Sequence, residues 1–177
     1  MPRYIALLRG VNVGGNNKIA MPQLKAALEA RGFSRVVTYI NSGNVLLNSD
    51  WAEPSVRQIC EETIQASFGL AIAVCVISAV DLADALAHAP VWWEAGEAVK
   101  HNAIFVIPPM TAADICTQVG ETQPDYEQVA CHGRVIFWSA PLKTFSRTRW
   151  SKITQHKAAY AHITIRNANT TRKLTAL

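Results

Sequence analysis

The chain has 177 residues, of which half are apolar and 17% are charged. This indicates one domain or two small ones with a real hydrophobic core, and it excludes long disordered stretches. The longest uncharged run near the middle, residues 68–80, is shorter than the roughly 20 apolar residues of a membrane-spanning helix. Residues 133–177 carry nine Lys or Arg and no acid, whereas residues 1–132 carry eight basic and thirteen acidic residues. This block of one sign predicts an anionic partner.

The first 80 residues predict the element order β-α-β-β-α-β. Pro22 suits the first turn of a helix, and Gly32 suits its end. The sequence Asn41-Ser42-Gly43-Asn44 predicts a tight turn between two strands. The predicted elements are a strand over 4–9, a helix between Pro22 and Gly32, strands over 36–40 and 45–47, a helix over 53–68 and a strand over 71–77.

A short helix over 81–88, with Asp81 as its expected cap, leads into a connector that contains Trp92 and Trp93. These two side chains either fill the core or stack on a base, and we favour the core. The first order of elements then recurs: a strand over 103–107, a helix over 112–119, strands over 127–131 and 134–138, a helix over 148–160 and a strand over 162–165.

The repeated order predicts the fold class. We expect an α+β protein made of two tandem ferredoxin-like β-α-β-β-α-β halves packed into one compact unit. The halves are residues 1–79 and 102–177, and the helix and connector at 80–101 join them.

The sequence predicts no metal site and no cofactor, and it identifies no catalytic residues. The four cysteines are far apart and form no CxxC pair, so we expect them to be reduced and buried (Cys60, Cys75, Cys116 and Cys131). The histidines show no ligand spacing, and neighbours such as Cys131 and His132 would face opposite sides of a strand. No signal-peptide pattern is present near Met1, so we expect a cytoplasmic protein without a membrane partner.

Three segments carry the candidate ligand-binding residues, and the first follows the first strand. Two adjacent glycines allow backbone N–H groups to approach a ligand, and the helix that follows adds positive potential. The alternative is that Gly and Asn only make the turns, because the spacing matches neither a Walker loop nor GxGxxG. The candidate residues are Arg9, Asn12, Gly14, Gly15, Asn16 and Lys18.

The second segment places Arg147, Arg149 and Lys152 around the start of the predicted helix over 148–160, with Ser146 as its expected cap. Cations at a helix N-terminus are unfavourable unless an anion lies beside them. This mismatch indicates a bound anion, and the alternative is a solvated basic face.

The third segment offers a dense set of hydrogen-bond donors suited to phosphate oxygens. Its candidate residues are Arg166, Asn167, Asn169, Thr170 and Lys173. The alternative is a capped final helix, with Asn169 or Thr170 as the cap. If the first and third segments bind one ligand, they should lie side by side in one pocket.

Three stretches resemble, in order, one bacterial family, the domain of unknown function 1697. They are LLRGVNVGG at residues 7–15, YINSGNV at residues 39–45 and TIRNANT at residues 164–170. Members usually have Gln in place of Asn41 and an aromatic residue in place of Ala168. The resemblance implies an α+β fold and brings no established activity.

We therefore expect a protein that binds a phosphate-bearing ligand, either a nucleotide or a nucleic acid. Two alternatives stay open. One is an enzyme acting on a small anionic metabolite at the junction of the two halves, held by Arg9, Lys18 and Arg166. The other is a non-catalytic module whose basic half meets an acidic protein. The oligomeric state also stays open.

Overall fold

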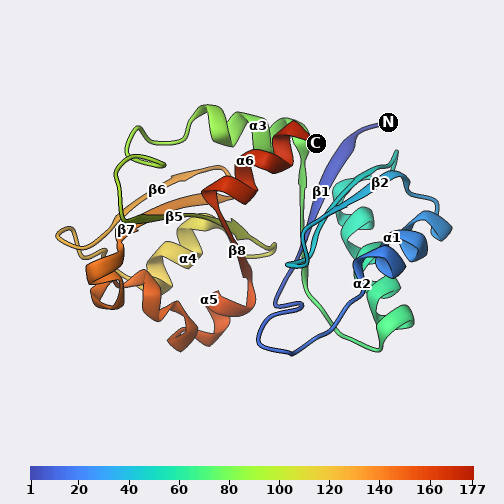
Figure 1. Ribbon diagram of the computed structural model, residues 1–177, viewed down its shortest axis with the longest axis horizontal. Coiled ribbons are helices and arrows are strands. Elements are labelled where there is room, and N and C mark those ends of the chain that lie inside the picture. Colours follow the sequence, from blue (N-terminus) through green and yellow to red (C-terminus); the bar gives the residue numbers. More distant parts are fainter. The chain divides into compact units, whose positions relative to one another are not determined.

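The computed structural model describes residues 1–177. It divides into two units, Met1–Ala83 with Leu174–Leu177, and Asp84–Lys173 (Figure 1). Each unit contains one four-stranded antiparallel sheet together with helices. The predicted α+β class is confirmed.

The first unit builds its sheet in the order β2-β3-β1-β4. Helices α1 and α2 pack on the same face of this sheet (Figure 1), because side chains such as Ala6 of β1 share one core with Leu24 of α1 and Val56 of α2. The elements are β1 (Arg3–Leu8), α1 (Met21–Ala30), β2 (Ser34–Tyr39), β3 (Asn44–Asn48), α2 (Glu53–Phe68) and β4 (Val74–Ser78).

The helix ends follow local rules that the sequence displays. Proline lies in the first turn of both α1 and α2, and α2 ends at Gly69 in the left-handed conformation. Helix α3 (Ala79–Ala87) follows β4, and its cap is Ser78 rather than the predicted Asp81. The Ser78 hydroxyl accepts from the Asp81 N–H at 3.0 Å and donates to the Asp81 carboxylate at 2.7 Å. Ser78 lies directly before the helix, so its hydroxyl can accept from the free N–H groups of the first turn. Asp81 lies inside that turn and is less well placed to do so.

The second unit builds its sheet in the order β6-β7-β5-β8. One face packs against α4, η2 and α5, where Ile115, Trp150 and Ala159 join a core with Ile104 and Ile136 of the sheet. The elements are β5 (Val99–Val106), α4 (Ala112–Val119), β6 (Gln128–His132), β7 (Val135–Pro141), the 3₁₀ helices η1 (Leu142–Arg147) and η2 (Trp150–Gln155), α5 (Lys157–Ala161), β8 (Ile163–Asn167) and α6 (Ala168–Ala176).

The predicted continuous helix over residues 148–160 is wrong. The chain there makes two 3₁₀ helices and then the short α5. The Thr148 hydroxyl donates to the Phe145 carbonyl at 2.7 Å, and Ser151 bonds to both the hydroxyl and the carbonyl of Thr148. Side-chain hydroxyls that bond the local backbone compete with the regular helical pattern. The apolar spacing was correct, since Trp150 and Ile153 are buried.

The prediction that the two tryptophans fill the core is confirmed for Trp93. Its side chain is buried, its indole N–H donates to the Asn102 carbonyl at 3.0 Å, and its ring meets the Phe137 ring edge-on at 4.9 Å. Trp92 stays partly exposed. None of the helices combines the length and the apolar character that crossing a membrane requires.

The hairpin between β2 and β3 depends on Gly43, whose φ is +84°. A Cβ at this position would lie 2.5 Å from Val11 Cγ2 and 2.8 Å from Leu8 Cβ. Both contacts are shorter than packed carbon atoms allow, and the backbone already lies in the left-handed region that favours glycine.

We predict that Gly43→Ala lowers the free energy of unfolding by about 2–4 kcal/mol, from left-handed strain and overpacking together. Gly69→Ala is the matched control, because Gly69 has φ +68° and an added Cβ would meet nothing within 4 Å. The control should cost only about 1–2 kcal/mol. Urea denaturation of both variants measures the difference, and equal losses would contradict the packing argument.

Candidate ligand-binding sites

The loop between β1 and α1 is held by its own asparagines. The Asn12 amide donates to the Ile19 carbonyl at 2.9 Å and to the Asn41 carbonyl at 2.7 Å, and its oxygen accepts from the Ile19 N–H at 2.9 Å. The Asn17 amide donates to the Gly10 carbonyl at 2.9 Å. Asn12 and Asn17 both adopt positive φ. Asn12 therefore has the turn-forming role that the alternative interpretation gave to the asparagines, because its side-chain amide bonds to backbone groups of the protein.

A cavity of about 410 Å³ opens beside this loop, at the start of α1. Asn12, Gly15, Lys18 and Asn41 line it together with residues 19–22. No side chain caps α1, and its first turn contains no acid. The cavity therefore combines an uncapped helix start, at which Pro22 offers no N–H group, with the exposed Lys18 cation. Gly14 and Asn16 are exposed in the same loop, and Arg9 is half-buried.

The buried carboxylate of Glu127 organises the second candidate segment. Oε1 accepts from the Gln123 and Arg149 N–H groups, each at 2.9 Å, and Oε2 accepts from the Trp150 N–H and the Trp138 indole N–H, each at 3.2 Å. The side chain that neutralises these N–H groups therefore belongs to the protein itself. The Glu127 carboxylate thus takes the place at this helix start where we expected a bound anion.

The cations of the same segment point to solvent. We name Lys143, Arg147, Arg149, Lys152 and Lys157 the basic surface. All five are exposed. None of them takes part in an ion pair with an acid. The charges of these five side chains are therefore not compensated by ion pairs.

Aromatic rings lie against two cations of the second unit, of which Arg147 belongs to the basic surface and Lys100 does not. The Arg147 guanidinium lies 5.7 Å from the centre of the Tyr126 ring, and Lys100 Nζ lies 4.5 Å from the centre of the Phe145 ring. Both contacts fall within the range of cation–π attraction. The second unit thus places a cation beside the ring face of both Tyr126 and Phe145.

A second cavity, of about 340 Å³, is lined by Tyr126, whose ring contacts Arg147 of the basic surface. We name it the aromatic pocket, because Trp92 and Tyr126 line it, with Glu127 and Ser139 also in its wall. The Ser139 hydroxyl lies 2.6 Å from Nδ1 of His101. Burial lowers the pKa of His101, against the opposing effects of the Ala95 carbonyl and of Glu94. The volume is at the small end of the range for small-molecule sites.

The third candidate segment has largely structural contacts. Arg166 is buried, and its Nη1 donates to the Thr164 hydroxyl and to the Ile165 carbonyl, each at 2.8 Å. The cap of α6 is Asn167, whose Oδ1 accepts from the Thr170 N–H at 2.8 Å. The prediction that Asn169 or Thr170 is the cap is wrong, because the helix begins at Ala168, two or three residues earlier than expected.

The other members of the third segment differ in exposure. Thr170 is buried, whereas Asn169 and Lys173 are exposed. The expected side-by-side placement of residues 9–18 and 166–173 joins segments of different units, and it stays a prediction.

The prediction that all four cysteines are buried is wrong for two of them. Cys60 and Cys75 are buried, but Cys116 of α4 is half-buried and Cys131 of the edge strand β6 is exposed. The two sulfurs lie 3.5 Å apart. A hydrogen bond from the Cys116 thiol lowers the pKa of Cys131 to about 7, whereas burial raises the pKa of Cys60 to about 12. Tertiary contact thus favours the thiolate form of one of the four cysteines.

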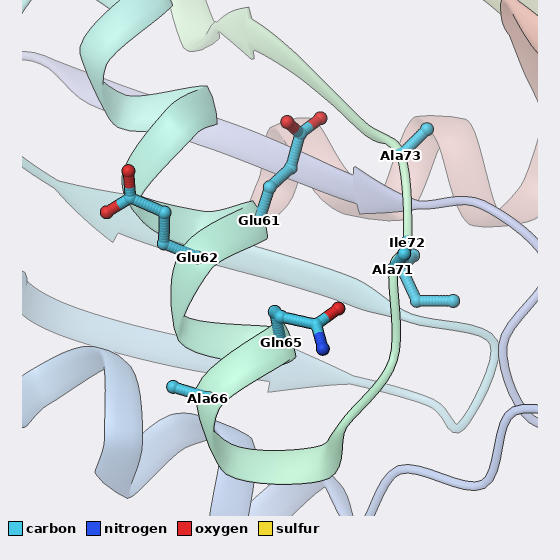
Figure 2. Close-up of a pocket in the computed structure, with 7 residues that line it drawn as sticks. All are labelled: Glu61, Glu62, Gln65, Ala66, Ala71, Ile72 and Ala73. Carbon is cyan, nitrogen blue, oxygen red and sulfur yellow. The ribbon is translucent and has the colours of Figure 1, made fainter.

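A larger hollow lies along α2, with a volume of about 590 Å³. Figure 2 shows Glu61, Glu62 and Gln65 on the helix side and residues 71–73 on the other side. The Glu61 carboxylate accepts from the Val74 N–H at 3.0 Å, and Glu62 pairs with Arg31 at 3.1 Å. These contacts tie α2 to its neighbours, and the acidic rim disfavours an anion.

The structure also brings together Asp84, His88 and His132, which the sequence did not group. Nε2 of His132 lies 2.7 Å from Oδ2 of Asp84, and this hydrogen bond lowers the pKa of the Asp84 carboxyl. The spacing of Asp84 and His88 is a helical i, i+4 signal that reveals two of the three residues of the cluster. His132 lies 48 residues from Asp84 in the sequence, so no local pattern reveals it.

Comparison with known proteins identifies the family. Residues 1–137 match the family described as "Protein of unknown function (DUF1697)". The chain belongs to this family. It is also similar to a solved structure, the conserved bacterial protein SP0830 from Streptococcus pneumoniae, with 28% identity and a TM-score of 0.88 over 99% of this chain and 97% of that one. Among curated proteins, none matches this chain.

We predict that Glu127→Gln lowers the free energy of unfolding by about 2–3 kcal/mol, because an amide nitrogen would face N–H donors that now meet a charged acceptor. Urea denaturation measures the change. Glu121→Gln is the control, since Glu121 is exposed and should change stability by less than about 0.5 kcal/mol. Similar values for both variants would contradict the role given to Glu127.

We predict that a small alkylating reagent labels Cys131 first at neutral pH, because the thiolate is the nucleophile. Its rate should fall as the pH drops below about 7, the value that the pKa of Cys131 takes. Cys116→Ala removes the donor and should slow labelling at pH 7, while Cys116→Ser keeps a donor and should slow it less. Mass spectrometry of timed samples measures the rates, and labelling of Cys60 at a similar rate would contradict the assignment.

Proposed function

We propose that this protein binds a phosphate-bearing ligand, and in the first place single-stranded nucleic acid, through the basic surface of its second unit. The observation that carries the proposal is the lack of any acidic partner for Lys143, Arg147, Arg149, Lys152 and Lys157. Neutralised phosphates release condensed counterions, which is the main source of affinity in such binding.

The neighbouring aromatic pocket supplies the second part of the interaction. Bases stack on aromatic side chains without strong sequence preference, and Trp92 and Tyr126 line the pocket. Asp125 and Glu127 also line it, so the pocket suits a neutral base better than a phosphate. Arg147 connects the two features through the Tyr126 ring, and the Arg149 backbone N–H does so by donating to the Glu127 carboxylate. Phosphates would thus follow the basic surface while a base enters the pocket.

A second candidate is the binding of a small phosphate-bearing metabolite in the cavity beside the first loop. It is favoured by the uncapped start of α1, which faces a cavity that Gly15 and Lys18 also line. An enzyme built on this cavity would use Lys18 to hold the anion.

We also propose that each unit is a ferredoxin-like fold. The support is the element order β-α-β-β-α-β together with the strand orders β2-β3-β1-β4 and β6-β7-β5-β8. Open sheets of this kind often serve RNA-binding proteins.

The test is the binding of a fluorescently labelled oligouridylate at a series of salt concentrations. If the five cations of the basic surface each neutralise one phosphate, log affinity should fall with log salt with a slope of about −3.5. Changing Lys143, Arg149, Lys152 and Lys157 to Gln should make that slope shallower by about 3 and weaken binding at low salt at least tenfold.

The matched control removes four charges from the first unit, through glutamine at Lys25, Arg31, Arg35 and Arg57. It should leave the slope nearly unchanged, and an equal loss in both quadruple variants would overturn the nucleic-acid proposal. Lys18→Gln separates the two candidates. It should abolish any thermal shift with inorganic pyrophosphate and leave oligouridylate binding intact.

A further inference from the structure

Three metal-ligating side chains from distant parts of the sequence meet in the second unit. Asp84 lies in α3, His88 directly follows that helix, and His132 ends β6. Each residue offers one ligand atom, and these atoms all lie within 4.8 Å of one another. The distances to the Asp84 carboxylate are 2.7 Å from Nε2 of His132 and 3.5 Å from Nδ1 of His88.

These spacings are close to what a metal requires. Ligand atoms about 2.0–2.2 Å from a tetrahedral ion lie roughly 3.3–3.5 Å from each other. The cluster therefore needs side-chain adjustments before its ligand atoms can close on an ion. One adjustment is clear, because the two imidazole rings are stacked, with centres 4.2 Å apart and an angle of 4° between their planes. An ion in the plane of both rings requires one of them to turn.

His88 can make this turn, because its side chain is 57% exposed. Its Nδ1 lies 2.9 Å from the Asp84 backbone carbonyl. When Nδ1 donates a proton to this carbonyl, Nε2 keeps its lone pair, so Nε2 rather than Nδ1 is the atom of His88 that would meet an ion. The side chains of Asp84 and His132 are also open to solvent, at 57% and 34%, so an ion can enter directly.

We infer that Asp84, His88 and His132 form a binding site for a divalent transition-metal ion. Two imidazoles and one carboxylate suit Zn²⁺, Co²⁺ or Ni²⁺ rather than Mg²⁺ or Ca²⁺, which prefer oxygen ligands. Three protein ligands leave a fourth position for water or for a ligand group. The bound ion also links the end of α3 to β6.

The inference does not depend on the proposed function, and metal binding alone tests it. Co²⁺ is titrated into the metal-free protein while the visible absorption is followed, and Zn²⁺ affinity is measured by competition with a chromogenic chelator. One ion per chain is expected. His88→Gln and His132→Gln should each weaken Zn²⁺ binding at least tenfold.

Two control variants separate this site from other ways of holding a metal. His156→Gln removes a histidine of the same unit outside the cluster and should leave the affinity unchanged. Cys116→Ser with Cys131→Ser removes the nearby thiol pair and should also leave it unchanged, with no sulfur-to-cobalt absorption band in the wild-type protein. Zn²⁺ binding that is lost with the thiols, or that weakens equally in all three histidine variants, would overturn the inference, as would no binding at all.

Discussion

The carboxylate of Glu127 is the interaction on which the second unit most depends. It lies among Trp138 of β7 and the backbone of Arg149 and Trp150, so it joins the sheet to the irregular segment that follows it. A buried carboxylate is stable only when several donors surround it. Here four donors do so, and the segment after β7 is thereby held in one conformation although it lacks a regular helix.

This contact also decides how the positive charge of the segment is presented. Because Glu127 satisfies the N–H groups of Arg149 and Trp150, their helix start does not require an external anion. The backbone of Arg149 is fixed, while its side chain is exposed with those of Lys143 and Lys152. The uncompensated charge lies on side chains directed to solvent, which is the arrangement that phosphate binding uses.

Much of the fold could be predicted from local sequence. Helices α2 and α4 have the predicted bounds, and the turn at Gly43 was recognised. The errors in the predicted helices come from hydrogen bonds between single hydroxyl side chains and the backbone near them. Ser78 replaced Asp81 as a cap because of where β4 ends, and Thr148 and Ser151 divided a predicted helix by bonding its backbone. In both places side-chain hydroxyls and the backbone competed for the same partners.

The sequence by itself determined the α+β class, the family and the concentration of positive charge in the last quarter of the chain. It could do so because periodicity, turn residues and charge are local properties. Only the tertiary structure decided that Arg166 is buried, that Cys116 contacts Cys131, and that Asp84 and His88 meet His132. These contacts join residues far apart in the sequence, and strand pairing and helix packing, which no local pattern encodes, bring them together.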